Sequence, residues 1–236
     1  MNILALDTAT ENCSVALLIE GRLHATEELL GRGHAERILS MIDALLREAR
    51  VGLTDLAAIA FGRGPGSFTG VRLAASVTQG LACGSGLGVV PVSDLRALAQ
   101  RALELPAAPQ RVLICSDARM HEVYWGCFER APDGFATAVN EERVGSPTQI
   151  LLPVTWTDAL VPVAGVGSGF AAYPELTATL PTSVFVVGER LLPRAAEIVR
   201  LAAPEVAGGR VFRPEQALPV YLRDDVARPG QRESLN

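Results

Sequence analysis

The stretch ILALD at residues 3–7 decides the fold, because it is a short apolar strand that ends in an aspartate. A polar turn follows, and the apolar run at residues 14–19 predicts a second strand that completes a β-hairpin. The same pattern returns as LICSD at residues 113–117, with its second strand predicted at residues 123–128. This weak internal repeat predicts two related α/β domains, each of which begins with a β-hairpin.

The segment between the two hairpins predicts further helices and strands. Residues 34–50 predict an amphipathic helix, and residues 71–83 predict a helix that is apolar on nearly every side and must be covered. Ser93 predicts the N-cap of a third helix. The pattern then breaks at LPAAP, which predicts a first lobe at residues 1–105 and a second at 106–236, with a tail that can pack back on the first lobe.

The composition of the 236-residue chain limits the functions open to it. With 49% hydrophobic and 20% charged residues, it has enough apolar side chains for a sizeable core, which excludes disorder. The net charge of −5 has the wrong sign for a stand-alone nucleic-acid-binding protein. All 21 basic residues are arginine, which excludes a Schiff-base lysine and a P-loop lysine. The apolar runs are too short to cross a bilayer and the N-terminus is unlike a signal peptide, so we expect a cytoplasmic protein without membrane contact.

The cysteines and histidines are dispersed along the sequence and form no zinc-binding pattern. His34 is followed four residues later by Ile38 instead of a second histidine, so a helical metal-binding pair is not formed. We interpret His34 as a polar contact near a helix start and predict no metal site. The cysteines are predicted to be buried reduced thiols: Cys13, Cys83, Cys115 and Cys127.

The sequence GPGSFTGVR at residues 64–72 lies between a predicted strand and a predicted helix. Backbone N–H groups in such a loop, together with the helix N-terminus, can face an anion. The glycine spacing matches neither a dinucleotide fingerprint nor a Walker loop. Alternatively, the loop is a tight turn whose glycines serve positive φ angles or close packing. The candidate nucleotide or anion site comprises Asp7, Gly64, Gly66, Ser67, Thr69, Gly70 and Arg72.

Asp7 and Asp117 end equivalent strands, in positions that suit a metal or a nucleophile held between two lobes. A phosphate-binding hairpin needs glycines directly after the aspartate, and neither turn has them. Both hairpins therefore look degraded as nucleotide sites, and Asp7 either stabilises its turn or keeps a functional role. The nucleophile elbow G-x-S-x-G is absent at both Ser67 and Ser168, which argues against a serine peptidase.

Motifs distributed in order along nearly the whole chain carry a family resemblance. They are ILALDTAT at the N-terminus, GHAERILSMI, GPGSFTGVR, residues 93–98, residues 117–119 with 122–124, GVGSG at 165–169 and PVYLR at 219–223. Together they resemble the bacterial TsaB (YeaZ) family, and GPGSFTG followed by Val-Arg is the most specific of them.

The resemblance implies an α/β protein with the two-lobed actin-like ATPase fold (ASKHA, ribonuclease H-like), each lobe a mixed β-sheet with helices. It implies a paralogue of TsaD, the subunit that transfers a threonylcarbamoyl group to N6 of the adenosine adjacent to the anticodon in ANN-decoding tRNAs. TsaD-like proteins bind metal through a His-x-x-x-His helix motif, and Ile38 removes one of those ligands here. The resemblance therefore implies a non-catalytic dimerisation or scaffold subunit, with no catalytic residue and no tightly bound cofactor.

The resemblance also implies partners. TsaB pairs with TsaD through helices of the first lobe, TsaE docks on that pair, and TsaC supplies the threonylcarbamoyl-adenylate. It further implies a homodimer in the absence of TsaD, ATP that is used by the complex, and tRNA bound only as part of the complex. The apolar surplus of the two helices at 34–50 and 71–83 independently favours an interface there, although both helices can instead simply pack on their own sheet. The predicted interface residues are Ile38, Leu39, Ile42, Leu45, Leu46, Ala74, Ala75 and Thr78.

Two other functions stay open at this level. A residual ATPase or small-molecule kinase of the same fold predicts tight ATP binding by the isolated chain. A glycoprotease-like peptidase requires a nucleophile or a metal that the sequence does not show.

Overall fold

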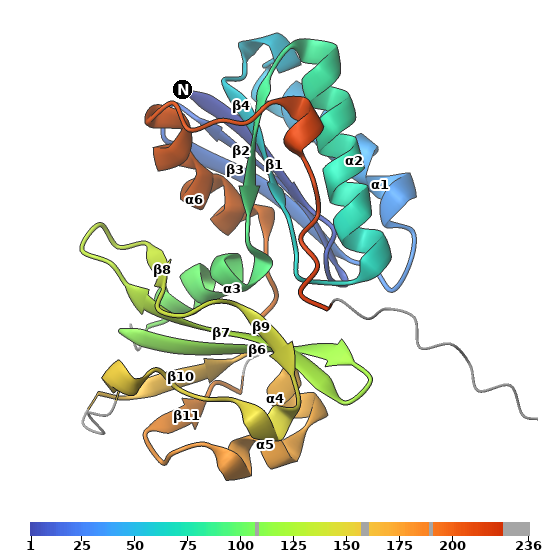
Figure 1. Ribbon diagram of the computed structural model, residues 1–236. Helices are drawn as coiled ribbons and strands as arrows, with labels where there is room; N and C mark the ends of the chain where they lie inside the picture. The colour runs from blue at the N-terminus through green and yellow to red at the C-terminus, as the bar shows by residue number, and fades with distance from the viewer. Residues whose placement is uncertain (107–108, 157–160, 189–190, 224–236) are drawn as a thin grey trace, which may run out of the picture.

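The computed structural model describes residues 1–106, 109–156, 161–188 and 191–223, which form two lobes (Figure 1). Each lobe is built around one β-sheet. Figure 1 shows the lobe with the N-terminal hairpin above and the lobe with the second hairpin below.

The first lobe contains a mixed sheet. Its strands are β1 (Asn2–Asp7), β2 (Asn12–Ile19), β3 (Arg22–Leu29), β4 (Ala58–Gly62) and β5 (Gly88–Val92). They lie in the order β3-β2-β1-β4-β5, with β2 antiparallel to β1 and β3, whereas β4 and β5 continue parallel to β1. The predicted N-terminal hairpin is confirmed.

Helices cover both faces of this sheet, because side chains along a strand alternate between its faces. Leu4 of β1 packs in a core with α1 (His34–Ala49) and α2 (Phe68–Ser85). Its neighbour Ile3 faces the other way and packs against α6 (Ala195–Ala207). The end of β1, where Asp7 lies, is therefore held between two layers of helices.

The second lobe repeats the central part of this topology. Its strands are β6 (Arg111–Arg119), β7 (Glu122–Arg130), β8 (Ala136–Ala138), β9 (Arg143–Gly145), β10 (Val163–Val166) and β11 (Val184–Val186). The sheet has the order β11-β10-β6-β7-β8, and β9 also pairs with β7. The β6–β7 hairpin is antiparallel and β10 runs parallel to β6, as β4 does to β1. The internal repeat predicted from the sequence thus has a counterpart in the structure.

Helices also cover both faces of the second sheet. Leu98 of α3 (Asp94–Leu103) packs on one face, and Phe170 of α4 (Ser168–Ala172) packs on the other. The remaining short helices are α5 (Pro174–Thr179), η1 (Leu53–Asp55), η2 (Pro147–Gln149), η3 (Val154–Trp156) and η4 (Pro214–Gln216).

The chain crosses between the lobes more often than the predicted boundary at residues 105/106 allows. Helix α3 precedes that boundary but packs on the second sheet, and α6 follows it but packs on the first. After α6, Phe212 forms an antiparallel bridge with Val89 of β5, and Ala217 is buried in the first-lobe core. The predicted boundary coincides with the connection from α3 to β6. The part of the chain that returns to the first lobe begins with α6 and is much longer than the predicted tail.

Some local predictions need correction. Helix α2 begins at Phe68 instead of residue 71, because Ser67 Oγ accepts a hydrogen bond from Gly70 N and caps the helix. Cys83 is exposed on α2, whereas the other three cysteines are buried as predicted. Of the helices in the described part of the chain, none combines the length and apolar character that crossing a bilayer requires.

Candidate functional site

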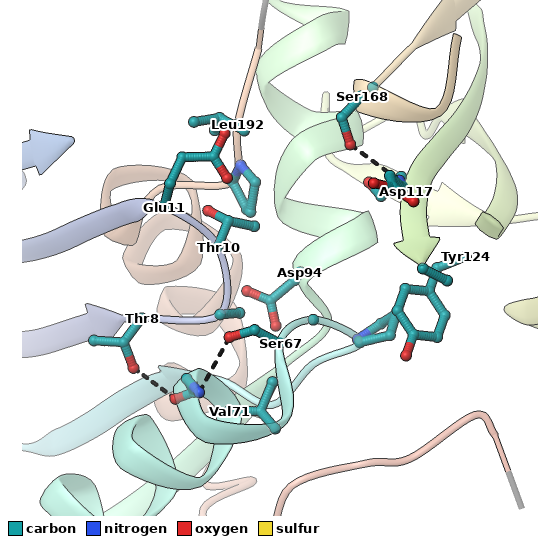
Figure 2. Close-up of a pocket in the computed structure, with 18 of the residues that line it drawn as sticks. Thr8, Thr10, Glu11, Ser67, Val71, Asp94, Asp117, Tyr124, Ser168 and Leu192 are labelled. Atoms are coloured by element: carbon teal, nitrogen blue, oxygen red, sulfur yellow. Dashed lines mark hydrogen bonds between the residues drawn. The ribbon is translucent and has the colours of Figure 1, made fainter. Parts of the chain in front are cut away.

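A cleft with a volume of about 1380 Å³ lies between the lobes (Figure 2). Its lining comes from the β1–β2 turn, the loop before α2, the start of α3, the β6–β7 hairpin and the loop before α4. Figure 2 shows Thr10 and Ser67 on the first-lobe side, Asp117 and Ser168 on the second-lobe side, and Asp94 between them. The predicted anion loop therefore does face the cleft.

The glycine-rich loop closes on the first hairpin and leaves no open cradle between them. A Cβ atom at Gly70 would lie 2.0 Å from the carbonyl oxygen of Thr8, and one at Gly66 would lie 2.6 Å from that of Ala9. Thr8 Oγ1 donates to Gly70 O at 2.7 Å, and Ser67 N donates to Ala9 O at 2.7 Å. The glycines at these two positions serve close packing of the loop against the hairpin.

The C-terminal part of the loop faces the end of the described chain. Arg72 Nε donates to the hydroxyl of Tyr221 at 2.6 Å, and its guanidinium carbon lies 3.5 Å from the centre of the Phe68 ring. Thr69 is exposed in the first turn of α2. Of the predicted anion-binding side chains, Arg72 is thus engaged by aromatic rings of its own chain.

Asp7 at the end of β1 and Asp94 at the start of α3 are buried side by side next to Gly62. Asp7 Oδ1 accepts a hydrogen bond from Ala9 N at 2.8 Å, and Asp94 Oδ2 accepts one from Gly64 N. Within the described residues, Asp7 Oδ2 and Asp94 Oδ1 are buried without a hydrogen-bond partner. A side-chain hydrogen bond between the two carboxyl groups requires that one of them carries a proton.

The surroundings of this pair favour protonation. Burial raises the pKa of Asp7 to about 6, because a carboxylate loses its hydration there. Burial, together with the negative charge of Asp7, raises the pKa of Asp94 well above its ordinary value. Asp7 could be predicted from the sequence, whereas Asp94 could not, because its place after the cap residue Ser93 looks like ordinary helix capping.

The second hairpin repeats the closed arrangement of the first. Gly167 has a φ of 123°, and a Cβ atom there would lie 2.2 Å from the carbonyl oxygen of Cys115. Ser168 Oγ accepts a hydrogen bond from Asp117 N at 3.0 Å, and the hydroxyl of Tyr173 donates to Asp117 Oδ1 at 2.8 Å. The Asp117 carboxylate is therefore held by its own lobe.

The histidine at the start of α1 makes a local contact. His34 Nε2 lies 2.9 Å from the carbonyl oxygen of Thr10, which confirms the predicted polar contact near a helix start. Ile38, one turn later, is buried in the first-lobe core. Over residues 1–106, 109–156, 161–188 and 191–223, no group of three or more His, Cys, Asp or Glu side chains is arranged to hold a metal ion.

Most of the predicted interface side chains face their own sheet. Leu46 is half-buried against the first-lobe core, and only Leu39 of the predicted set is well exposed, at 54%. The others pack inside their own lobe in the single chain, and the contact of these two helices with a partner stays a prediction. The buried ones are Ile38, Ile42, Leu45, Ala74, Ala75 and Thr78.

Known proteins are similar to this chain over nearly its whole length. The sequence model of the family described as "TsaD: tRNA N6-adenosine threonylcarbamoyltransferase" matches residues 27–227. The chain is 42% identical over 231 residues to the "tRNA threonylcarbamoyladenosine biosynthesis protein TsaB" of Escherichia coli (strain K12), covering 96% of each chain. It is 40% identical over 233 residues to the protein of that name in Haemophilus influenzae, covering 96% of this chain and 95% of that one.

Solved structures agree with the sequence comparison. "YeaZ from Pseudomonas aeruginosa" has a TM-score of 0.85 and 44% identity, and the match covers 94% of this chain and 99% of that one. This match confirms the predicted two-lobed, actin-like arrangement of two mixed sheets with helices.

Proposed function

Because this chain belongs to the TsaB (YeaZ) family, we propose that it takes part in threonylcarbamoyladenosine biosynthesis in tRNA as a non-catalytic subunit. In this proposal the chain is a scaffold partner of TsaD, and TsaE docks on the pair. TsaD then modifies N6 of the adenosine adjacent to the anticodon in ANN-decoding tRNAs. Without TsaD the chain pairs with a second copy of itself.

The closed GPGSFTG loop is the observation that carries this proposal. A phosphate-binding loop presents free N–H groups and enough space for an anion. Here the carbonyl oxygens of Thr8 and Ala9 fill the space in front of Gly70 and Gly66. Carbonyl oxygens repel an anion, so this arrangement supports a subunit that binds no nucleotide tightly and leaves the use of ATP to the assembled complex.

The acid pair supports the same conclusion. A carboxylate that binds a metal or activates a nucleophile must be ionised and reachable by its substrate. Asp7 and Asp94 are both buried, and one oxygen of each already accepts a hydrogen bond from a backbone N–H of the first lobe. Their arrangement suits a structural role at the junction of β1 and α3.

The outward face of α1 and α2 is the surface that we propose for TsaD. Leu39 is a large exposed apolar side chain on α1, and a Cβ atom added at Gly80 or Gly84 of α2 would meet nothing within 4 Å. Small exposed residues let a partner helix approach closely, because interaxial distance depends on the side chains at the contact. The exposed small residues of α2 are Ser76, Gly80, Cys83 and Gly84. Because the net charge is −5, we assign tRNA binding to the complex and not to this chain alone.

Isothermal titration calorimetry of the isolated chain with magnesium and ATP tests the non-catalytic part of the proposal. We expect no measurable binding, while TsaD binds the same preparation. Tight ATP binding would instead favour the residual ATPase or kinase. Hydrolysis that is lost in Asp7→Asn but kept in the exposed control Asp43→Asn would then place a working site at the acid pair.

A further inference from the structure

The last described residues run from the first lobe to the second. Figure 1 shows this segment, coloured red, descending beside α2 from η4 toward the lower lobe. It begins after Ala217, which is buried in the first-lobe core. Val220 N donates to Arg63 O at 2.7 Å, and Val220 O lies 2.9 Å from the place of a Cβ atom at Gly64. The first half of the segment is thus fastened to the loop that follows β4.

The middle of the segment rests on the start of α2. The hydroxyl of Tyr221 accepts the hydrogen bond from Arg72 Nε, and the ring centres of Tyr221 and Phe68 lie 6.0 Å apart. Tyr221 is nevertheless 43% exposed and Leu218 is 62% exposed. Little apolar surface is therefore buried here, so hydrophobic burial alone holds the segment weakly.

The end of the segment is held by the second lobe. The Arg223 guanidinium pairs with the Glu122 carboxylate and also donates to the carbonyl oxygens of Ala118, at 3.2 Å, and Arg119, at 3.5 Å. All three oxygens are contacted by the same nitrogen, Arg223 Nη2, and the contact with the carboxylate is charge-assisted. This contact joins the C-terminal segment to the tip of the β6–β7 hairpin.

That hairpin tip is strained. Arg119, Met120 and His121 all have positive φ angles, of 62°, 55° and 60°. This region is uncommon for residues other than glycine, and a run of three needs support from its surroundings. Arg223 supplies such support, because its Nη2 reaches the carbonyl oxygens of Ala118 and Arg119 at the start of the turn.

The segment also divides the space between the lobes. Val220 and Leu222 line the interlobe cleft on one side. The same two residues line a second hollow of about 680 Å³ on the other side, together with Arg63 and Glu142. If the segment moved away, the two spaces would join.

We propose that residues 218–223 form a releasable latch that fixes the separation of the two lobes, with Arg223 as its fastening residue on the second lobe. The latch is held at its base by Ala217 and at its end by Arg223, with weakly buried residues between. Release frees the β6–β7 hairpin and opens the cleft into the second hollow. The proposal does not depend on the assignment of TsaD as a partner.

Amide hydrogen exchange of the full chain, read residue by residue by NMR, tests the latch. Val220 N reports its closure, because this amide donates to Arg63 O. In Arg223→Ala we expect Val220 and the hairpin amides at residues 119–122 to exchange about tenfold faster, since a charge-assisted contact is removed. Glu122→Gln keeps the carbonyl acceptors and should give a smaller increase at the same amides.

The matched control is Arg210→Ala, which removes an exposed ion pair with Glu205 in the first lobe and should leave both sets of amides unchanged. The double variant Glu122→Arg with Arg223→Glu should restore only the part of the protection that the ion pair supplies, because a glutamate at position 223 cannot donate to the carbonyl oxygens of Ala118 and Arg119. Unchanged Val220 exchange in Arg223→Ala would overturn the proposal. So would faster exchange in the hairpin alone, because Arg223 would then support the turn without fastening the segment.

Discussion

The carboxyl groups of Asp7 and Asp94 lie together beside Gly62, and a Cβ atom at that glycine would lie 2.6 Å from Asp7 Oδ1 and 2.5 Å from Asp94 Oδ1. Asp7 ends the central strand of the first sheet, whereas Asp94 begins the helix that packs on the second. The pair therefore joins the two lobes at the floor of the cleft, and Gly62 provides the space that both carboxyl groups need.

The acid pair predicts a pH-dependent stability. Both pKa values are raised in the folded chain, so the folded state binds these protons more tightly than the unfolded state does. The stabilisation is present at low pH and is lost as the pH rises from about 4 through 6, the folded pKa of Asp7. In Asp94→Asn, the amide can accept from Gly64 N and donate to Asp7 without needing a proton. Urea unfolding should show this variant to be about 1 kcal/mol more stable at pH 8.

The stability difference between Asp94→Asn and the parent should shrink toward pH 4.5, where the parent carboxyl groups are protonated in the folded state. Asp43→Asn, at an exposed position of α1, serves as the control and should show the same offset at both pH values. A difference for Asp94→Asn that does not change with pH would mean that the pair holds no extra proton.

Two glycines of α2 provide a matched test of the closed loop. Gly70→Ala places a Cβ atom 2.0 Å from Thr8 O, so we expect a loss of about 3 kcal/mol through overpacking. Gly80→Ala lies on the same helix with no atom within 4 Å of the new Cβ, and should stabilise the chain by about 0.5–1 kcal/mol. Equal effects of the two substitutions in thermal unfolding would contradict the close packing described for Gly70.

The return of α6 to the first lobe depends on a buried ion pair. Glu197 is fully buried in α6, and Arg194 Nε donates to Glu197 Oε2 at 3.0 Å. Arg194→Met leaves this carboxylate without its charge partner, and should cost about 3 kcal/mol of folding free energy. The control Arg200→Met breaks the more exposed pair with Glu104 and should cost less than about 1 kcal/mol. Chemical denaturation measures the loss in free energy of unfolding for each variant. Similar losses in Arg194→Met and Arg200→Met would contradict the importance of the buried pair between Arg194 and Glu197.

A substitution on the outward face of α1 should weaken partner binding without lowering the stability of the fold. Leu39→Glu changes an exposed side chain, so the fold should be unaffected, while TsaD binding and self-association should weaken at least tenfold. Val154→Glu introduces the same charge at an 86% exposed apolar position of the second lobe and is the control. Pull-down and sedimentation measurements that show no difference between the two variants would place the partner elsewhere.

The sequence predicts the elements of the fold well because the periodicity of apolar residues is local. The hairpin at the N-terminus, the repeat at residues 113–117 and the helix at residues 34–50 all appear close to their expected bounds. The amphipathic stripe of α1 shows that one face is buried, but not what buries it. Ile38 and Ile42 therefore fit a partner interface and an internal core equally well until the sheet beneath them is seen.

Contacts between distant parts of the chain could not be predicted in the same way. Asp94 approaches Asp7 because β1, β4 and α3 meet in space, and neither residue has a local pattern that points to the other. The contact of Arg223 with Glu122 likewise depends on how two lobes are placed. The glycines of the GPGSFTG loop left two uses open; the carbonyl oxygens in front of Gly66 and Gly70 show that these two positions require close packing, while anion binding by the loop stays a prediction.

The most direct test of the central claim is tRNA threonylcarbamoylation in a reconstituted mixture of the matching TsaC, TsaD and TsaE. Mass spectrometry of the digested tRNA would measure the modified adenosine with and without this chain, and with Asp7→Asn in its place. We predict that modification requires the chain and that the Asp7→Asn variant, once shown to be folded, supports it fully. Modification in the absence of the chain, or its loss with folded, TsaD-binding Asp7→Asn, would contradict a non-catalytic scaffold.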